Sequence, residues 1–512
     1  MAPSIWMDKR PTKSYNKLKP QVTGGIVVTL QVEWQPDRKS DLPLHYQILM
    51  HIKNKIIRGE WPVGTKIPSQ RRLAAEYGVN RSTIVMALDE LAADGFLRGN
   101  RGGGTVVAHS REEEPDSTPP PDWLSYVSSG IQSSNIPIIQ EINQAEFRKD
   151  VIRLGTGELA PDLLPYKEMR AVLQALTKES MPLGYEEPKG NAGLRQLISQ
   201  HVEEYGIDAS PSSILIVSGA LQALHLLSIS LLHRGSTVLL ERPSYLYSVP
   251  IFQSAGMKLA GVPMDREGIR ADLIPMIKKQ HNGAMLYTIP TFHNPTGTVM
   301  SRDRREKLLQ ACIKEGLPLI EDDVYRELWM DAPPPMPLKA ADAGGHVLYL
   351  GSFSKSVSPG LRIGWIIGPE PVIDRLADIK MQTDYGASSL SQAAAAQWLA
   401  SGLYQEHIHA LRQQLQYRRS IAVSALEKHF GDLAQWEVPA GGFYIWLHLT
   451  PPVPLKSLFA AALKEGILLN PGHLYEGDPS GHLRISYAYA SLHDLETGIY
   501  RLAVLVKQML RA

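Results

Sequence analysis

The sequence predicts a multidomain protein, with a small α+β domain near the N-terminus and a large α/β domain after it. Two observations predict these classes. Residues 43–109 have the pattern of three short helices followed by two strands around a glycine-rich tip, which is the element order of a winged helix-turn-helix. From residue 151 onward, strands alternate with helices, which is typical of a parallel sheet with helices on both faces. The length of 512 residues fits two or three domains.

Composition and terminal signals narrow the class of protein. Hydrophobic residues make up 44% of the chain, which is enough for sizeable cores and excludes a disordered protein. No stretch approaches the roughly 20 continuous apolar residues of a membrane span, so we expect no membrane partner. The N-terminus lacks the apolar core of a signal peptide. The single cysteine, Cys312, suits a reducing compartment, so we expect a cytoplasmic protein.

Composition also divides the chain into four segments. Residues 1–40 show little periodicity and are expected to be a loose basic extension. Residues 41–109 make up the winged helix-turn-helix domain. Residues 110–150 begin with an acidic run and contain three prolines at 119–121, so we expect an extended linker with loose structure. Residues 151–512 make up the large α/β domain.

Each element of the small domain has its own local signals. A helix over residues 44–58 carries apolar side chains on one face, at Leu44, Ile48, Ile52, Ile56 and Ile57. Ser69 is a good N-cap for the second helix, and Gly78 is a good stop. The third helix opens at Asn80 and ends at Gly95, and residues 96–107 then read as two short strands.

The charge of this domain predicts contact with nucleic acid. Residues 43–109 hold nine Lys or Arg and five Asp or Glu. We expect the third helix to be the recognition helix, with Asn80, Ser82 and Thr83 near base edges. Arg71, Arg81 and Arg101 are expected to reach phosphates or guanines. The alternative is a small interaction domain whose charged face is solvated.

The same residues carry a resemblance to a known family. The segments Pro68-Ser69-x-Arg71-x-Leu73-Ala74, Arg81-Ser82-Thr83 and Gly102-x-Gly104-Thr105 resemble the GntR family of bacterial transcription regulators. The resemblance implies binding to double-stranded DNA and adds Gly102 to the expected DNA-binding residues. Val85 stands where several relatives carry a further basic residue, so one DNA contact of the family is missing here.

The large domain contains a lysine in a serine-rich turn, Lys355, just after an apolar run that predicts a buried strand. Ser352 and Ser354 lie beside it, and Arg362 follows. A lysine that forms a Schiff base must reach an aldehyde and stay close to neutral, while hydroxyls and a cation hold the phosphate of its cofactor. For this turn alone, a solvated lysine is the better interpretation.

Two further turns follow predicted strands and suit the same cofactor. The turn at Gly219, Ala220 and Leu221 opens a helix, and its free N–H groups suit a phosphate. Tyr245 lies just beyond the strand 237–241, where its ring can stack on a flat heterocycle. Ordinary loop packing is the alternative for this tyrosine.

Two more strands end in polar residues at the carboxyl edge of the predicted sheet. Asn294 lies in an Asn-Pro-Thr-Gly turn, at the edge where open α/β sheets bind ligands. Asp322 and Tyr325 end the next strand, and a carboxylate here can pair with a protonated pyridine nitrogen. Metal binding is the alternative for the adjacent Asp322 and Asp323. No histidine has matching spacing, so we predict no metal site.

The order of these motifs resembles the class I aminotransferases, which are fold-type I pyridoxal-phosphate enzymes, over about residues 151–512. The resemblance implies that Lys355 forms a Schiff base with pyridoxal 5'-phosphate and that Asp322 pairs with the pyridine nitrogen. It implies that Asn294 and Tyr325 bond the phenolic oxygen and that Tyr245 stacks on the ring. The residues that it implies for the phosphate are Gly219, Ala220, Leu221, Ser352, Ser354 and Arg362.

Two more residues take their roles from this resemblance. Tyr185 matches a tyrosine that usually reaches the phosphate of a neighbouring subunit, which implies a dimer with shared sites. Arg484 matches the arginine that binds the substrate carboxylate, and its planar fork suits that group.

The two domains together resemble the MocR subfamily of GntR-type regulators. The resemblance implies a domain-swapped homodimer with pyridoxal phosphate as cofactor and an amine or amino acid as effector. We therefore expect a transcription regulator that senses pyridoxal phosphate, an amine or an amino acid through aldimine formation and acts on a double-stranded DNA operator. A working aminotransferase that also binds DNA is the alternative, and a fold kept only for dimerisation is a third hypothesis. The sequence does not decide whether the protein is an enzyme.

Overall fold

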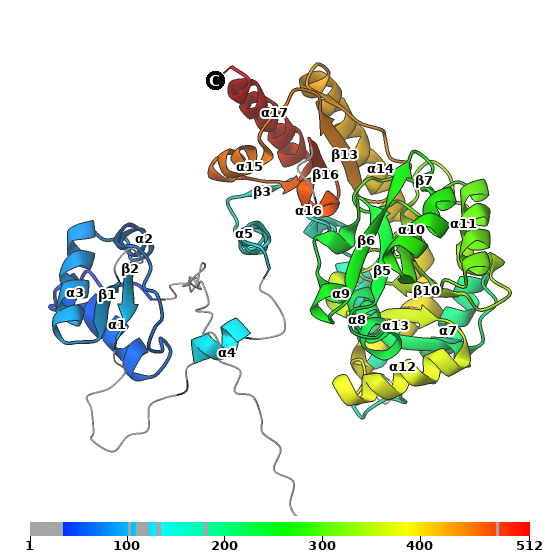
Figure 1. Cartoon of the computed structure of the whole chain (residues 1–512), viewed down its shortest axis with the longest axis horizontal. Coiled ribbons are helices and arrows are strands. Elements are labelled where there is room, and N and C mark those ends of the chain that lie inside the picture. The colour runs from blue at the N-terminus through cyan, green and yellow to red at the C-terminus, as the bar shows by residue number, and fades with distance from the viewer. Residues whose placement is uncertain are drawn as a thin grey trace, which may run out of the picture. The chain divides into compact units, whose positions relative to one another are not determined.

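The computed structural model of the chain describes residues 34–100, 104–108, 121, 123–129, 135–178, 183–477 and 481–511. The chain divides into two compact units, residues 1–131 and 132–512 (Figure 1). The first unit holds the winged helix-turn-helix and the second the large α/β domain, so the predicted fold classes are confirmed.

The small unit packs three helices against a β-hairpin. Its elements are α1 (Leu44–Ile57), α2 (Gln70–Glu76), α3 (Arg81–Ala93), β1 (Leu97–Asn100) and β2 (Gly104–Val107). Strands β1 and β2 are antiparallel, and Lys66 bridges to Val106 on the outer side of β2. Ser69 caps α2, since its hydroxyl accepts a hydrogen bond from the backbone N–H of Arg72 at 3.3 Å.

The core of this unit corrects one sequence-based expectation. Ile48, Ile52 and Ile56 of α1 are fully buried, but Ile57 is 44% exposed. Leu49 faces the core instead. Positions i, i+1, i+4 and i+8 of a helix lie on one face, which here holds Ile48, Leu49, Ile52 and Ile56, and residue 57 lies outside that face.

Residues 34–38 pack on the small unit, although the sequence suggested a loose extension as far as residue 40. The indole of Trp34 stacks on His51 with ring centroids 4.3 Å apart. Gln35 Nε2 donates to the carbonyl of Glu76 at 2.7 Å, and Arg38 donates to that of Gly78 at 2.6 Å. The rest of the expected extension, residues 1–33, lies outside the described residues.

The large unit is built on an eight-stranded sheet with the order β4-β11-β10-β9-β8-β5-β6-β7. Strands β11 and β7 run antiparallel to their neighbours, and the others are parallel. The bounds are β4 (Ile214–Val217), β5 (Thr237–Arg242), β6 (Lys258–Asp265), β7 (Gly268–Ile269), β8 (Gly283–Thr288), β9 (Leu319–Asp322), β10 (Val347–Ser352) and β11 (Gly364–Ile367).

Helices cover both faces of this sheet because alternate strand residues are apolar on each face. In β5, Leu239 joins one core with α10 and α11, while Val238 and Leu240 join the other with α8, α12 and α13. Cys312 is buried in the first core. These helices are α8 (Ala220–Leu231), α10 (Ile274–His281), α11 (Arg302–Glu315), α12 (Glu370–Thr383) and α13 (Ser389–Ala400).

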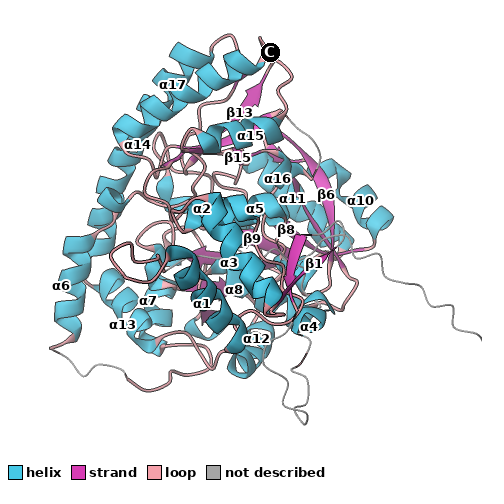
Figure 2. Ribbon diagram, turned by 90° about the vertical axis from the view of Figure 1, so that its left-hand side faces the viewer, coloured by secondary structure: helices cyan, strands magenta, loops and turns pink. Residues whose placement is uncertain are grey.

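A smaller sheet and its helices complete the unit. The sheet has the order β12-β13-β16-β15, and α17 packs along the long α14 beside it (Figure 2). The bounds are β12 (Ala434–Gln435), β13 (Tyr444–Leu449), β15 (Asn470–Pro471), β16 (His482–Ser486), α14 (Leu403–Phe430) and α17 (Leu492–Met509). The remaining elements are β3 (Ile152–Arg153), β14 (Ile467–Leu468), α6 (Tyr166–Leu176), α7 (Ala192–Glu203), α9 (Ile251–Ser254), α15 (Leu455–Lys464) and α16 (His473–Glu476).

The structure differs from the sequence-based linker at 110–150. Residues 137–145 form helix α5 (Pro137–Ala145), and the large unit begins at residue 132. Ile142 and Ala145 are buried in the main core of that unit. Their spacing is helical, so burial of this face stabilises a helix where the acidic and proline-rich composition suggested a loose chain. A second short helix, α4 (Trp123–Ser129), lies in the first unit.

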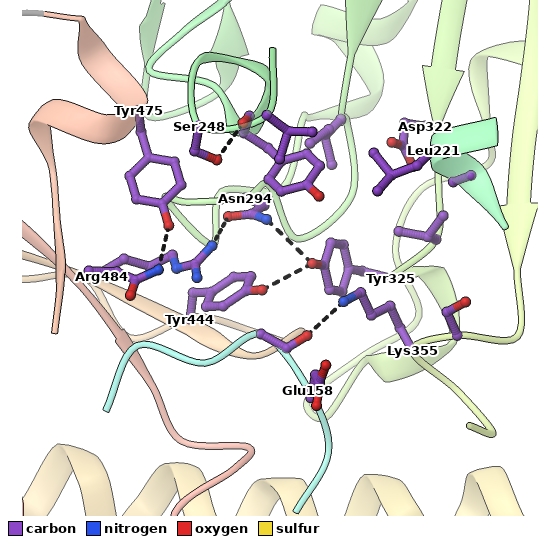
Figure 3. Close-up of a pocket in the computed structure, with 18 of the residues that line it drawn as sticks. Glu158, Leu221, Ser248, Asn294, Asp322, Tyr325, Lys355, Tyr444, Tyr475 and Arg484 are labelled. Atoms are coloured by element: carbon purple, nitrogen blue, oxygen red, sulfur yellow. Dashed lines mark hydrogen bonds between the residues drawn. The ribbon is translucent and has the colours of Figure 1, made fainter. Parts of the chain in front are cut away.

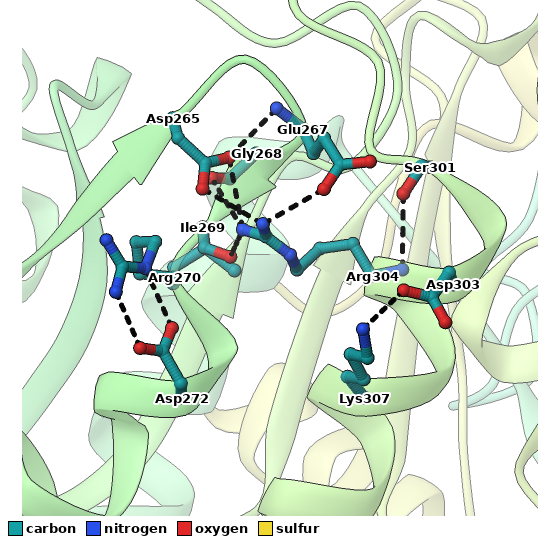
Figure 4. Close-up of polar contacts among 10 residues, drawn as sticks. All are labelled: Asp265, Glu267, Gly268, Ile269, Arg270, Asp272, Ser301, Asp303, Arg304 and Lys307. Carbon is teal, nitrogen blue, oxygen red and sulfur yellow. Dashed lines mark hydrogen bonds and ion pairs between the residues drawn. The ribbon is translucent and has the colours of Figure 1, made fainter.

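A polar cluster ties the β6–β7 hairpin to the start of α11 (Figure 4). The guanidinium of Arg304 donates to Asp265 at 2.9 Å, to Glu267 at 3.2 Å and to the carbonyl of Ile269 at 2.7 Å. Ser301 caps the helix by accepting from the backbone N–H of Arg304. The hydrogen bonds from Arg304 lower the pKa of Asp265. One side chain, only 13% exposed, therefore joins three elements.

We expect the substitution Arg304→Ala to lower the free energy of unfolding by about 1.5–3 kcal/mol, because it removes charge-assisted hydrogen bonds at a mostly buried position. Urea unfolding followed by circular dichroism measures this. The matched control is Arg302→Ala on the same helix, because Arg302 is 88% exposed and forms a surface pair with Glu306. Its loss should cost less than about 0.5 kcal/mol. Equal effects of the two substitutions would contradict this account of the cluster.

Candidate cofactor site and nucleic-acid interface

A cavity of about 310 Å³ lies at the carboxyl ends of the central strands of the large sheet (Figure 3). Most of the expected site residues line it. These are Ala220, Leu221, Tyr245, Asn294, Asp322, Tyr325, Ser352, Ser354, Lys355, Arg362 and Arg484. Gly219 precedes this set and touches Arg362. The structure therefore brings together residues that are up to 265 positions apart in the sequence.

Lys355 projects into the cavity from the turn after β10. Its Nζ donates a hydrogen bond to the carbonyl of Gly157 at 2.6 Å, so the amine is held in place (Figure 3). The turn is fixed by its serines. The hydroxyl of Ser352 donates to the carbonyl of Ile363 and accepts from the backbone N–H of Ser354 at 3.1 Å. The lysine is thus presented by a rigid turn at the end of a buried strand.

Asp322 ends β9 and is 5% exposed. Its Oδ2 accepts a hydrogen bond from the hydroxyl of Tyr287 at 2.7 Å, while its Oδ1 has no partner among the described residues. Burial raises the pKa of Asp322 to about 6, because the charged form loses hydration. A buried carboxylate oxygen without a partner costs free energy, so the cavity favours a ligand that donates a proton or a positive charge at this point.

The turn at the start of α8 provides a part of the cavity that suits an anion. Gly219 has a φ of 88° and stands at the start of α8. The guanidinium of Arg362 donates to the carbonyl of Ser218 at 2.8 Å, and a Cβ at Gly219 would lie 2.7 Å from its Nη2. Only glycine fits this approach. A helix N-terminus and an arginine together favour a phosphate or carboxylate.

Arg484 extends from β16 and is 5% exposed. Its guanidinium lies between the rings of Tyr444 and Tyr475, at 4.3 Å and 4.8 Å. It donates to Asn294 Oδ1 at 2.9 Å and to the carbonyl of Gly155 at 2.6 Å. Its Nε has no partner among the described residues, so the charge remains available to an anion.

A chain of hydrogen bonds connects these groups. Asn294 Nδ2 donates to the hydroxyl of Tyr325 at 3.5 Å, and the hydroxyls of Tyr325 and Tyr444 lie 3.1 Å apart. The backbone N–H of Tyr245 donates to the carbonyl of Asn294 at 3.2 Å. Because Asn294 also accepts from Arg484, its amide is oriented with Nδ2 toward Tyr325.

Several residues that support the site carry no local motif in the sequence. Tyr444 and Tyr475 line the cavity and flank Arg484, while Tyr287 lies outside the lining and donates to Asp322. One face of α5 also lines the cavity, with Ile139, Ile142 and Asn143, and so does its C-cap residue Glu146. The helical spacing of these apolar residues after Pro137 was the signal that could have identified it.

Tyr185 is not brought to the cavity of its own chain. It is 83% exposed, and its ring lies 4.9 Å from that of Tyr385, which is also exposed. An aromatic pair in this state is open to contact from another molecule.

The expected DNA-binding residues lie around the start of α3. Arg71, Arg81 and Ser82 are exposed, Asn80 is the exposed N-cap residue, and Thr83 is partly exposed. A concave surface between α2, α3 and β2 is lined by residues that include Arg71, Arg81 and Lys66. Lys66 was not singled out from the sequence. Arg101 and Gly102 lie outside the described residues.

Contacts within this surface hold one arginine in place. The guanidinium of Arg81 donates twice to Gln70 Oε1, at 3.2 Å and 3.0 Å. This links the start of α3 to the start of α2 and leaves part of the fork free for an acceptor.

Comparison with known proteins identifies the family. The model of bacterial regulatory proteins of the gntR family matches residues 44–107, and that of aminotransferase class I and II matches residues 149–502. The uncharacterized HTH-type transcriptional regulator YisV of Bacillus subtilis is 55% identical, over 93% of this chain and 99% of the relative. This chain belongs to the MocR subfamily of GntR-type transcription regulators. The HTH-type transcriptional regulator NorG of Staphylococcus aureus is 33% identical, over 87% of this chain and all of NorG.

Solved structures resemble the large unit of this MocR-type regulator. Kynurenine aminotransferase from Pyrococcus horikoshii, solved in complex with PMP, is 30% identical with a TM-score of 0.71, over 75% of this chain and 96% of that chain. The α-aminoadipate aminotransferase LysN of Thermus thermophilus, complexed with N-(5'-phosphopyridoxyl)-L-leucine, is 30% identical with a TM-score of 0.69, over 76% of this chain and all of that chain. Among the described residues, no helix has the length and apolar character needed to cross a membrane.

The pKa of Asp322 predicts a pH dependence for the ligand-free MocR-type protein. An aspartate in the unfolded chain has a pKa near 3.9, and the folded value is about 6. As pH rises through this window, the unfolded chain releases its proton first, so the folded state loses stability between about pH 4 and pH 6. Asp322→Asn removes this loss and should be more stable than the unsubstituted protein above pH 6, by roughly 3 kcal/mol.

Urea unfolding of both proteins at pH 4.5, 6 and 7.5 tests this expectation. Tyr287→Phe is the companion variant, because it removes a donor that lowers the pKa of Asp322 and should extend the loss of stability to higher pH. Parallel stability curves for the unsubstituted protein and Asp322→Asn would refute the assignment of the shift to this carboxylate.

Proposed function

We propose that the large unit binds pyridoxal 5'-phosphate and an amine or amino-acid effector, and that this binding controls the attachment of the winged helix-turn-helix to its operator. The observation that carries the proposal is the buried Oδ1 of Asp322, which has no partner in a cavity that also holds Lys355. A protonated pyridine nitrogen provides the donor that this atom lacks. The relatives solved with PMP or a phosphopyridoxyl group support the same cofactor.

The chain's residues fit this cofactor in one orientation. Asp322 would face the ring nitrogen, and Asn294 and Tyr325 would bond the phenolic oxygen. Tyr245 would stack on the ring and Lys355 would attach at the aldehyde. The residues placed to hold the phosphate are Gly219, Ala220, Leu221, Ser352, Ser354 and Arg362. The bound cofactor supplies an aldehyde that reacts with amines and a ring that withdraws electrons.

The polar groups of the cavity have different roles when an effector binds. Lys355 Nζ, which donates to the carbonyl of Gly157, would exchange protons with the amine of the effector. Arg484 binds the carboxylate of an amino acid, and Asn294 and the two flanking tyrosines fix its orientation. Asp322 keeps the ring nitrogen protonated.

Helix α5 provides a physical route from the cavity to the DNA-binding unit. It lines the cavity, and its N-terminal end is the first element after the connection between the units. An effector that binds more tightly when α5 is in one of two positions shifts the equilibrium toward that position of the helix. Only this difference in affinity can change the behaviour of the regulator.

A homodimer is part of the proposal. Tyr185 is remote from its own cavity and exposed, which supports its reaching the phosphate site of a second copy. In such a dimer each site is completed by the partner, so assembly and cofactor binding stabilise each other.

A working aminotransferase is the second candidate function. Its support is the complete set of Lys355, Asp322 and Arg484 in a fold shared with aminotransferases. Sustained production of a keto acid from an amino acid and an oxo acid by the purified protein would favour it. Binding that shifts the cofactor absorbance without conversion to the pyridoxamine form favours the sensor.

We expect Lys355→Ala to lose the covalent attachment of the cofactor and the response of operator binding to effectors, because no other lysine lines the cavity among the described residues. Visible absorbance and electrophoretic mobility shifts with operator DNA measure the two effects. Lys339→Ala is the control, since Lys339 pairs with Asp342 away from the cavity. An unchanged effector response in Lys355→Ala would disprove the sensing mechanism.

We expect Arg81→Ala to weaken operator binding by at least about tenfold while leaving cofactor uptake unchanged. Affinity should also fall steeply with salt through counterion release, and Lys66→Ala should reduce the slope of that dependence by about one. Fluorescence anisotropy between 50 and 200 mM salt provides both values. The control is Lys53→Ala, because Lys53 pairs with Asp94 away from the concave surface. A footprint that survives Arg81→Ala would refute the assignment of the recognition helix.

A further inference from the structure

The α5 wall of the cavity differs from the walls that suit the cofactor. It begins with the apolar side chains of Ile139 and Ile142 and continues with Asn143 and Glu146. Glu158 lies near them in the loop that carries Gly157, beside Lys355 (Figure 3). This wall therefore has an apolar part followed by two carboxylates. Among the described residues that line the cavity, the only cations are Lys355, Arg362 and Arg484.

The two carboxylates form no close ion pair with a described cation, although the charges of Arg153 and Arg484 act on Glu146. Glu146 accepts a hydrogen bond from the hydroxyl of Thr156 at 3.0 Å, and neither Glu146 nor Glu158 forms an ion pair with a described residue. Of the cations near them in sequence, Arg148 pairs with Asp150, and Arg153 lies five residues before Glu158. Its Nη1 donates to the hydroxyl of Tyr489 at 2.7 Å and its guanidinium lies over the same ring. Burial, with the charge of Glu158, raises the pKa of Glu146 and outweighs the hydrogen bond from Thr156 and the charges of Arg153 and Arg484. A cation placed against this carboxylate would therefore be stabilised.

Arg484 fixes the direction in which a ligand lies. It is buried, and its Nε lacks a partner among the described residues, so a ligand carboxylate belongs on this side of the cavity. An α-amine then belongs at Lys355. With both groups placed, the side chain of an amino acid is left to run along Ile139 and Ile142 toward the two glutamates.

We infer that the effector is an amino acid whose aliphatic side chain ends in a positively charged group, and that Glu146 and Glu158 bind this group. The inference rests on the proposed function and names the class of effector for the same cavity. The aliphatic part of such an effector side chain can pack against the two isoleucines. Its ammonium or guanidinium group can bind both carboxylates, which otherwise repel each other. An acidic side chain of the same length meets two like charges and is excluded.

The test uses the full-length protein loaded with pyridoxal 5'-phosphate and three probes of similar length: L-ornithine, L-norvaline and L-glutamate. Isothermal titration calorimetry gives the dissociation constants, and cofactor absorbance reports binding at the cavity. We expect L-ornithine to bind at least about tenfold more tightly than L-norvaline, the factor given by one charge-assisted hydrogen bond. L-Glutamate should bind more weakly than L-norvaline.

Substitutions test whether Glu146 and Glu158 cause the preference for L-ornithine. Glu146→Gln and Glu158→Gln should each reduce the ratio between L-ornithine and L-norvaline and leave the constant for L-norvaline unchanged. The matched control is Glu141→Gln on the same helix, because Glu141 is exposed and does not line the cavity. This control should keep the full ratio. Thermal unfolding and cofactor uptake show whether each variant is folded.

The outcomes separate this inference from the proposed function. Equal binding of L-ornithine and L-norvaline, or a ratio that survives both glutamate substitutions, would overturn the inference and leave the sensor intact. Preferred binding of L-glutamate would overturn it as well. If none of the probes, nor a wider panel of amines, perturbs the cofactor absorbance, the proposed sensing function itself fails.

Discussion

The buried carboxylate of Asp322 is the constraint on which the organisation of the large unit depends. Strand register decides its position, since Asp322 is paired with Leu350 of β10 and the neighbouring Glu321 points to the opposite face. There Glu321 accepts from the backbone N–H groups of Leu338 and Lys339 and lies 3.5 Å from Arg305. A slip of one residue would exchange the two acids and place a charge in the wrong core. The core and the cavity are therefore specified by the same pairing.

The fold and much of the site could be predicted because their signals are local. The caps at Ser69 and Gly78, the strand-to-helix turn at Gly219 and the serine-rich turn around Lys355 are contiguous patterns with a direct physical meaning. The groups that orient the site are different. Tyr287, Tyr444 and the carbonyl of Gly157 are distant in the sequence from the groups that they hold. Their roles follow from tertiary contacts, which no local pattern encodes.

Helix α5 shows a second limit of sequence reasoning. An acidic and proline-rich stretch precedes it, and that composition predicted a loose linker where the structure has a short amphipathic helix. The helix is stabilised by burial of Ile142 and Ala145 against the rest of the unit, not by its own length. Composition predicts the behaviour of an isolated segment, whereas this segment takes its structure from the surface on which it packs. For this reason α5 was assigned to the linker, although two of its residues are buried in the core of the large unit.

The position of α5 has a consequence for how strongly the regulator binds its operator. In a dimer, two DNA-binding units are tethered to one body, and the second contact with DNA forms at an effective concentration that depends on where each tether begins. Helix α5 is the point at which each tether begins in the large unit. A small displacement of this helix changes the span that the tethers must cover, and effective concentration falls steeply when a tether is too short for its span. In the proposed homodimer, binding of an effector in the cavity would thus change avidity for two half-sites without any change in the recognition helix.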